Sequence, residues 1–128
     1  MQDLERTYRG YIHMINERRF EQSHRFASPE MTFSGTAMSR EDYFGGIQQA
    51  LEAVPDFQWQ IDRLVVDGDW VASRVVGTGT PVRPWMGLQP NGRSVTFVEH
   101  AFYHCPGGKI TTVEFVRDVD AIRAQLTA

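Results

Sequence analysis

The sequence has a single cysteine, Cys105, among its 128 residues, and it has no long run of apolar residues. One cysteine excludes an internal disulfide and any metal cluster built from cysteines. A helix that spans a bilayer needs about 20 mostly apolar residues, so we expect no membrane segment. Met1–Glu5 is polar and acidic, unlike the basic start of a secretory signal peptide, and we therefore expect a cytoplasmic protein.

An excess of positive charge is also lacking. The chain carries 13 Lys and Arg against 16 Asp and Glu, for a formal net charge of -3. Because nucleic-acid binding requires a basic surface that neutralises phosphates, this balance argues against nucleic acid as a partner. Hydrophobic residues make up 41% of the chain and predict a globular protein, and the length fits one domain, residues 1–128.

Motifs of several common chemistries are missing. The chain has no Gly-rich phosphate loop, no His-Glu-x-x-His pair and no Gly-x-Ser-x-Gly elbow. The four histidines are His13, His24, His100 and His104. They lack the spacing of metal ligands, so we predict no metal site in this protein.

The first half of the chain has helical periodicity and the second half has the two-residue period of strands. We predict helices at residues 2–19, 20–26 and 39–54, and a short strand at 31–33. We predict longer strands at residues 57–66, 70–80, 93–104 and 109–118, followed by a last helical turn or two. This order predicts an α+β fold, with N-terminal helices packed on one face of a curved antiparallel sheet.

Charged residues interrupt the last two apolar strands. Glu99 and His100 lie within the first, and Asp118 ends the second. If Gly107-Gly108 forms a two-residue loop, Glu99 shares a face with Asp118, whereas a three-residue loop that starts at Pro106 puts His100 there. Either pair would serve as acid and base. The structural alternatives are that Asp118 caps the C-terminal helix and that Glu99 and His100 face solvent or a subunit.

Aromatic residues and one arginine complete the candidate site. Trp85 lies in a Pro-rich loop, where it would fold over the mouth of a cavity. Arg74, in mid-strand, must be exposed or paired with a carboxylate, because a buried unpaired charge is costly. Tyr11 and Tyr43 lie on apolar helix faces and would line a pocket with their hydroxyls. The predicted ligand contacts are Tyr11, Tyr43, Trp59, Arg74, Trp85, Phe97, Tyr103 and Phe115.

A resemblance to a known family runs along nearly the whole chain. Its motifs are Pro55-Asp56-Phe57-x-Trp59-x-Ile61, Leu64-Val65-Val66-Asp67-Gly68-Asp69-Trp70-Val71-Ala72-x-Arg74, Gly77-Thr78, Gly87-x-x-Pro90-x-Gly92-Arg93-x-Val95-x-Phe97, Gly108-Lys109-Ile110, Asp118 and Gln125-Leu126. In their order and spacing these motifs resemble the SnoaL-like polyketide cyclases of the nuclear-transport-factor-two-like superfamily.

The resemblance implies a cone in which helices and a curved sheet enclose an apolar pocket, and a homodimer or higher oligomer built on the sheet. It implies that the aspartate matching Asp118 is the acid and base of an intramolecular aldol closure without metal or cofactor, with Tyr11 in the pocket. We therefore predict an enzyme acting on a hydrophobic, carbonyl-containing small molecule, with Glu99 or His100 as second acid or base. The alternatives are a binding protein without chemistry, and an epoxide hydrolase, dehydratase or isomerase of the same superfamily.

Overall fold

The computed structural model describes residues 3–128 and places helices first and long strands last. The elements are α1 (Leu4–Asn16), the short 3-10 helix η1 (Phe20–Arg25), β1 (Ala27–Phe33), β2 (Thr36–Ser39), α2 (Arg40–Ala53), β3 (Gln58–Asp67), β4 (Trp70–Gly79), β5 (Val95–His104), the 3-10 turn η2 (Pro106–Gly108), β6 (Ile110–Arg117) and α3 (Val119–Leu126). The predicted α+β class is confirmed. The first strands differ from the prediction, because β1 begins earlier than expected and a further strand, β2, pairs with it.

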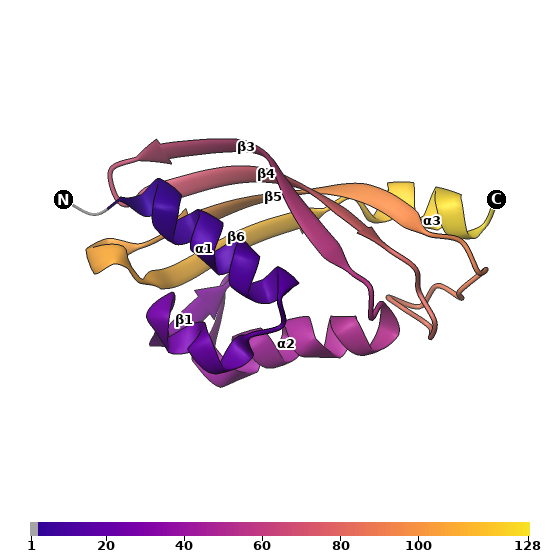
Figure 1. Cartoon of the computed structure of the whole chain (residues 1–128), viewed down its shortest axis with the longest axis horizontal. Helices are drawn as coiled ribbons and strands as arrows, with labels where there is room; N and C mark the ends of the chain where they lie inside the picture. Colours follow the sequence, from indigo (N-terminus) through magenta and orange to yellow (C-terminus); the bar gives the residue numbers. More distant parts are fainter. Residues whose placement is uncertain (1–2) are drawn as a thin grey trace.

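Within residues 3–128, six strands form one curved, open sheet in the order β2-β1-β6-β5-β4-β3 (Figure 1). All neighbours are antiparallel except β1 and β6, which run parallel. The sheet is therefore mixed rather than wholly antiparallel. The chain leaves β1 through β2 and α2 and comes back beside it only as β6, and a parallel pair needs such a long crossover.

Helices α1 and α2 lie on the same side of the sheet (Figure 1). The apolar stripe of α1 is buried there, as is the start of α2. The Ser39 hydroxyl accepts a hydrogen bond from the Asp42 backbone at 3.0 Å, so the predicted cap begins α2. No helix among the described residues is long and apolar enough to cross a membrane.

The register of the long hairpin differs from both turn lengths considered above. Glu99 pairs with Arg117 and His104 pairs with Thr112, so the connection is longer and contains the turn η2. Asp118 follows in register, and its backbone N–H donates to the Val98 carbonyl at 3.0 Å. Alternation along the strand then turns Glu99 toward the helices and puts His100 on the outer face with Asp118.

The outer face of the sheet, which the helices do not cover, exposes several large apolar side chains. They are Val65, Trp70, Phe102 and Val116, each between 39% and 69% exposed. Soluble monomers seldom expose wide apolar patches. This surface is where the resemblance implies a homodimer, and that association stays a prediction.

On the helix-covered face of the sheet, aromatic rings pack directly against the backbone of β4. The Phe57 ring stacks on Trp59 with centroids 3.9 Å apart and meets Phe97 edge-on at 5.4 Å. Gly77 lies against this group, and a Cβ atom there would come within 2.8 Å of Phe97 and 2.9 Å of Phe57. Only glycine at this position lets the stack lie directly on β4.

We predict that Gly77→Ala lowers the free energy of unfolding by about 1 to 3 kcal/mol, because the added methyl group overpacks the stack. Gly45→Ala is the control. A Cβ at this α2 position meets nothing within 4 Å, and alanine favours helix over glycine by about 1 kcal/mol, so this variant should gain stability. Denaturant unfolding measures both. An equal gain in both variants would contradict the close packing at Gly77.

Candidate active site

A cavity of about 440 Å³ lies between the helices and the sheet. Its lining is mostly apolar and aromatic and consists of Tyr11, Ile12, Ile15, Phe33, Met38, Asp42, Tyr43, Gly46, Ile47, Ala50, Trp59, Val75, Glu99, Ala101, Tyr103, Phe115 and Arg117. Asp42 is exposed at the start of α2. The volume of the cavity is typical of small-molecule sites, which range from about 300 to 1,000 Å³.

Glu99 is the buried carboxylate of this cavity and is only 3% exposed. Its Oε2 accepts a hydrogen bond from Nε of Arg117 at 2.6 Å, and its Oε1 accepts one from the indole Nε1 of Trp59 at 2.9 Å. Arg117 is its cross-strand partner on β6, and Trp59 reaches it from β3. Each oxygen is thereby oriented by one donor, and an ionised carboxylate has about four acceptor positions, so capacity remains toward a ligand.

Arg117 brings the matching positive charge into a box of aromatic rings. Its guanidinium carbon lies 5.2 Å from the ring centres of both Trp85 and Phe115. Phe97 and Phe57 follow at 5.7 Å and 6.0 Å. Arginine is weakly hydrated and stacks on aromatic faces, so the box lowers the cost of holding this cation beside Glu99.

Four tyrosines gather at α1, α2 and β5. The hydroxyls of Tyr11 and Tyr43 hydrogen-bond to each other on the cavity wall. Tyr8 hydrogen-bonds to Ser73 at 2.7 Å, and its ring lies 4.9 Å from that of Tyr103. Burial raises the pKa of Tyr8 to about 12. Burial also raises the pKa of the other three phenols, with a further contribution from the Glu99 charge at Tyr43, so all four stay neutral donors near neutral pH.

The structure brings together most of the predicted site. The predicted residues on the cavity wall are Tyr11, Tyr43, Trp59, Glu99, Tyr103 and Phe115. Trp85 and Phe97 do not line it. They belong to a second hydrophobic cluster, which packs against the guanidinium of Arg117 on the side away from the cavity. Trp85 is 5% exposed, so it is a core residue and does not cover the mouth of the cavity.

The other three predicted residues lie on the outer face. Arg74 pairs with Asp62 at 2.8 Å and contacts the ring nitrogen of His100 at 3.1 Å, so it is both partly exposed and paired. Asp118 is exposed and caps α3, with its Oδ1 accepting from the Ala121 backbone at 3.0 Å. The structure therefore does not bring Asp118 or His100 to Glu99, because the hairpin register assigns them to opposite faces.

Sequence reasoning missed Arg117. The signal was present, because Val113, Phe115 and Arg117 are spaced by two and share a strand face. A buried carboxylate on the neighbouring strand requires a cation nearby, and Arg117 is the basic residue that this alternation would have offered. Within residues 3–128, no three His, Cys, Asp or Glu side chains gather as a metal site would require.

Known proteins share the sequence pattern and the fold of this chain. The sequence profile of the SnoaL-like polyketide cyclases matches residues 5–126. The chain belongs to the SnoaL-like polyketide cyclase family. No curated protein matches the chain.

Solved structures agree with the family assignment. A SnoaL-like polyketide cyclase from Agrobacterium tumefaciens is 31% identical, with a TM-score of 0.93 over 98% of this chain and 99% of that one. IdmH from Streptomyces antibioticus is 24% identical, with a TM-score of 0.89 over 99% and 100% of the two chains. TsrD from Streptomyces laurentii is 20% identical, with a TM-score of 0.88 over 98% and 97%. The last two similarities support the cone fold of the family.

We predict that Arg117→Met lowers the free energy of unfolding by about 3 to 5 kcal/mol, because it leaves the Glu99 charge buried without its partner. The double variant Glu99→Gln with Arg117→Met should recover most of this loss, since neither charge then remains. Urea unfolding of the single and double variants measures the coupling. Additive losses would show that the two side chains do not depend on each other.

We also predict a steep loss of stability in alkali. Exposed phenols ionise near pH 10, and the buried phenols resist ionisation, so above about pH 10 the unfolded chain releases protons first. The free energy of unfolding should fall as the pH rises from there through the pKa of Tyr8 at about 12. Phenolate absorbance and circular dichroism should change together, and Tyr8→Phe should weaken the pH dependence. Ionisation of all phenols without unfolding would contradict their burial.

Proposed function

We propose that this protein is a cofactor-independent enzyme that moves a proton at a carbon next to a carbonyl group of a hydrophobic small molecule. The observation that carries the proposal is the buried carboxylate of Glu99, which Trp59 and Arg117 orient on the wall of an apolar cavity. General acid–base catalysis needs such a positioned group within reach of the reacting proton. Membership in the polyketide cyclase family supports a carbonyl compound as the substrate.

In the proposed first step, Glu99 takes a proton from the carbon beside the carbonyl. The electron pair of that C–H bond forms a carbon–carbon double bond, and the π electron pair of the carbonyl moves onto its oxygen to give an enolate. The hydrogen-bonded pair of Tyr11 and Tyr43 supplies the donor for this oxygen. One hydroxyl donates to the other, so the accepting tyrosine keeps its own O–H group for the substrate. A neutral donor fixed in an apolar site stabilises the developing negative charge more strongly than water does.

In the proposed second step, the enolate carbon attacks another carbonyl carbon of the same molecule and forms a carbon–carbon bond. The carbonyl oxygen of that group becomes an alkoxide and takes the proton back from Glu99. Atoms and charge balance, and Glu99 returns to its starting state. The sequence is an intramolecular aldol closure, which needs no cofactor when the substrate already carries both carbonyl groups.

A binding role without chemistry is the second candidate. One observation favours it, namely that both oxygens of Glu99 already accept a hydrogen bond while most of the cavity is apolar. In that case the ion pair would serve only to close one end of a ligand pocket. The two candidates differ in whether a bound carbonyl compound exchanges its protons.

The deciding experiment compares Glu99→Gln with Asp118→Asn, a matched carboxylate-to-amide change on the outer face. Aryl alkyl ketones are incubated with each protein in deuterated water, and exchange of the protons beside the carbonyl is followed by NMR. Glu99→Gln should slow exchange by about 100-fold or more, the usual contribution of a general base. Asp118→Asn should match the unchanged protein, since asparagine also caps helices.

Each other outcome has a defined meaning. Exchange that survives Glu99→Gln but fails in Asp118→Asn would transfer the acid–base role to the residue that the family resemblance indicates. Ketone binding without exchange in any of the proteins, detected by tryptophan fluorescence, would establish the binding role and reject the enzyme.

A further inference from the structure

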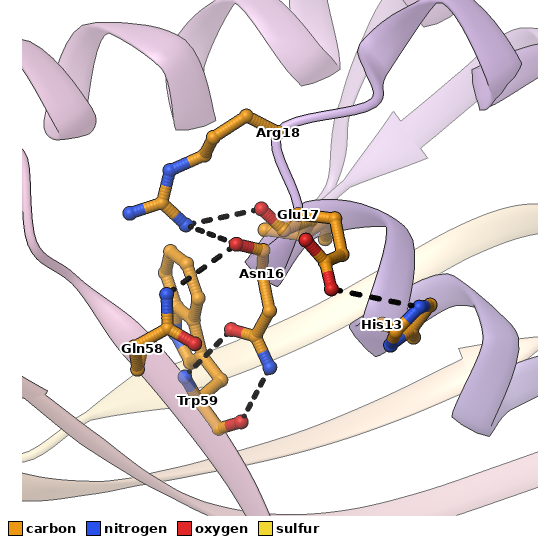
Figure 2. Close-up of polar contacts among 7 residues, drawn as sticks. His13, Asn16, Glu17, Arg18, Gln58 and Trp59 are labelled. Atoms are coloured by element: carbon orange, nitrogen blue, oxygen red, sulfur yellow. Dashed lines mark hydrogen bonds and ion pairs between the residues drawn. The ribbon is translucent and has the colours of Figure 1, made fainter.

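Asn16, the last residue of α1, binds the backbone of Trp59 at two points. Its Nδ2 donates to the Trp59 carbonyl at 2.8 Å, and its Oδ1 accepts from the Trp59 N–H at 2.9 Å (Figure 2). Trp59 lies on β3, an edge strand of the sheet, and it pairs with Gly77 of β4 on the other side. The amide of Asn16 therefore occupies the place that a further strand would take, which satisfies the edge backbone of Trp59.

The side chain of the same tryptophan reaches the proposed catalytic carboxylate. Its indole Nε1 donates to Oε1 of Glu99 at 2.9 Å. Stacking on Phe57, with an angle of 16° between the rings, limits how the indole can turn. With the ring held by this stack and the backbone held by Asn16, the direction of the indole N–H is determined by the position of the Trp59 backbone.

A strained helix end holds Asn16 in turn. Arg18 has a φ of 61°, which is uncommon for a residue other than glycine. Its guanidinium donates to the carbonyls of Pro55 at 2.9 Å and Phe57 at 2.6 Å, just before β3. It also donates to the Asn16 carbonyl at 3.2 Å. These bonds fix the end of α1 to the start of β3. Ending the helix would not by itself require bonds to Pro55 and Phe57.

We infer that Asn16 is a positioning residue that acts through Trp59 to orient the carboxylate of Glu99 in the cavity. Among the described residues, both hydrogen bonds of the Asn16 side chain go to Trp59 and neither goes to its own helix. This inference rests on the proposed function only for its effect on catalysis. The contact itself is testable without a substrate.

The substrate-independent test uses the three tryptophans of the chain, which give three indole N–H signals in a proton–nitrogen NMR spectrum. Trp59→Phe assigns the signal of interest. Asn16→Ala should shift the Trp59 signal and speed its exchange with solvent, while the signals of Trp70 and Trp85 stay in place. Gln58→Ala is the matched control, because Gln58 bonds to the Asn16 carbonyl at 3.3 Å and should leave the Trp59 signal unchanged.

A second variant, Asn16→Asp, keeps the test decisive if Asn16→Ala does not fold. Asn16→Asp keeps an acceptor for the Trp59 N–H and loses the donor to the Trp59 carbonyl, so it should shift the signal less than alanine does. An unchanged Trp59 signal in a folded Asn16→Ala or Asn16→Asp protein would overturn the inference and leave Asn16 as a helix anchor only.

The catalytic part is tested with the ketone exchange assay. Asn16→Ala should lower the exchange rate by up to about 100-fold at saturating ketone with little change in KM, because small misplacement of a catalytic group has this effect. In a Trp59→Phe background, Asn16→Ala should lower the rate no further, since its route to Glu99 is then missing. An additional loss in that background would show that Asn16 does not act through Trp59 and would overturn the inference. Failure of the proposed function is recognised separately, by exchange that survives Glu99→Gln.

Discussion

The ion pair between Glu99 and Arg117 is the interaction around which the cavity is built. A buried charge loses its hydration, and a buried pair is tolerated only with good geometry and further hydrogen bonds. Both conditions are met, because the two side chains stand opposite each other on adjacent strands and Trp59 donates to the remaining carboxylate oxygen. Four aromatic rings around the guanidinium then replace part of its lost hydration.

The two hydrophobic clusters have different roles around this pair. The cluster that contains Trp85 and Phe97 lies behind Arg117 and fixes the cation. The other cluster, built from α1, α2 and the sheet, supplies the tyrosines and the apolar wall of the cavity. A charged pair at one place and neutral hydroxyls at another give an apolar ligand two distinct polar contacts. This division supports the proposal of a carbonyl compound as the substrate.

Helix α1 contributes to the site in its middle and at its C-terminal end. In its middle, Tyr8 and Tyr11 pack against Tyr103 of β5. At its end, Asn16 hydrogen-bonds to the backbone of Trp59 on the edge strand β3, and the side chain of Trp59 hydrogen-bonds to Glu99. The helix thus connects the tyrosine cluster to the ion pair through the sheet, and its docking fixes the relative position of the proposed donor and the proposed base.

The sequence by itself determined the α+β class, the cap of α2, the alternation of the strands and six of the residues that line the cavity. These features follow from periodicity, which is local. Only the tertiary structure decided that Glu99 faces the cavity while Asp118 and His100 lie outside. A shift of one residue in the hairpin reverses every face, and contacts from distant segments set the turn. The Cys105 N–H donates to the Asp69 carbonyl at 2.8 Å, and the Ile110 N–H donates to the Phe26 carbonyl at 2.8 Å. No local pattern contains those partners, so the register, and with it the choice of carboxylate, had to come from the folded chain.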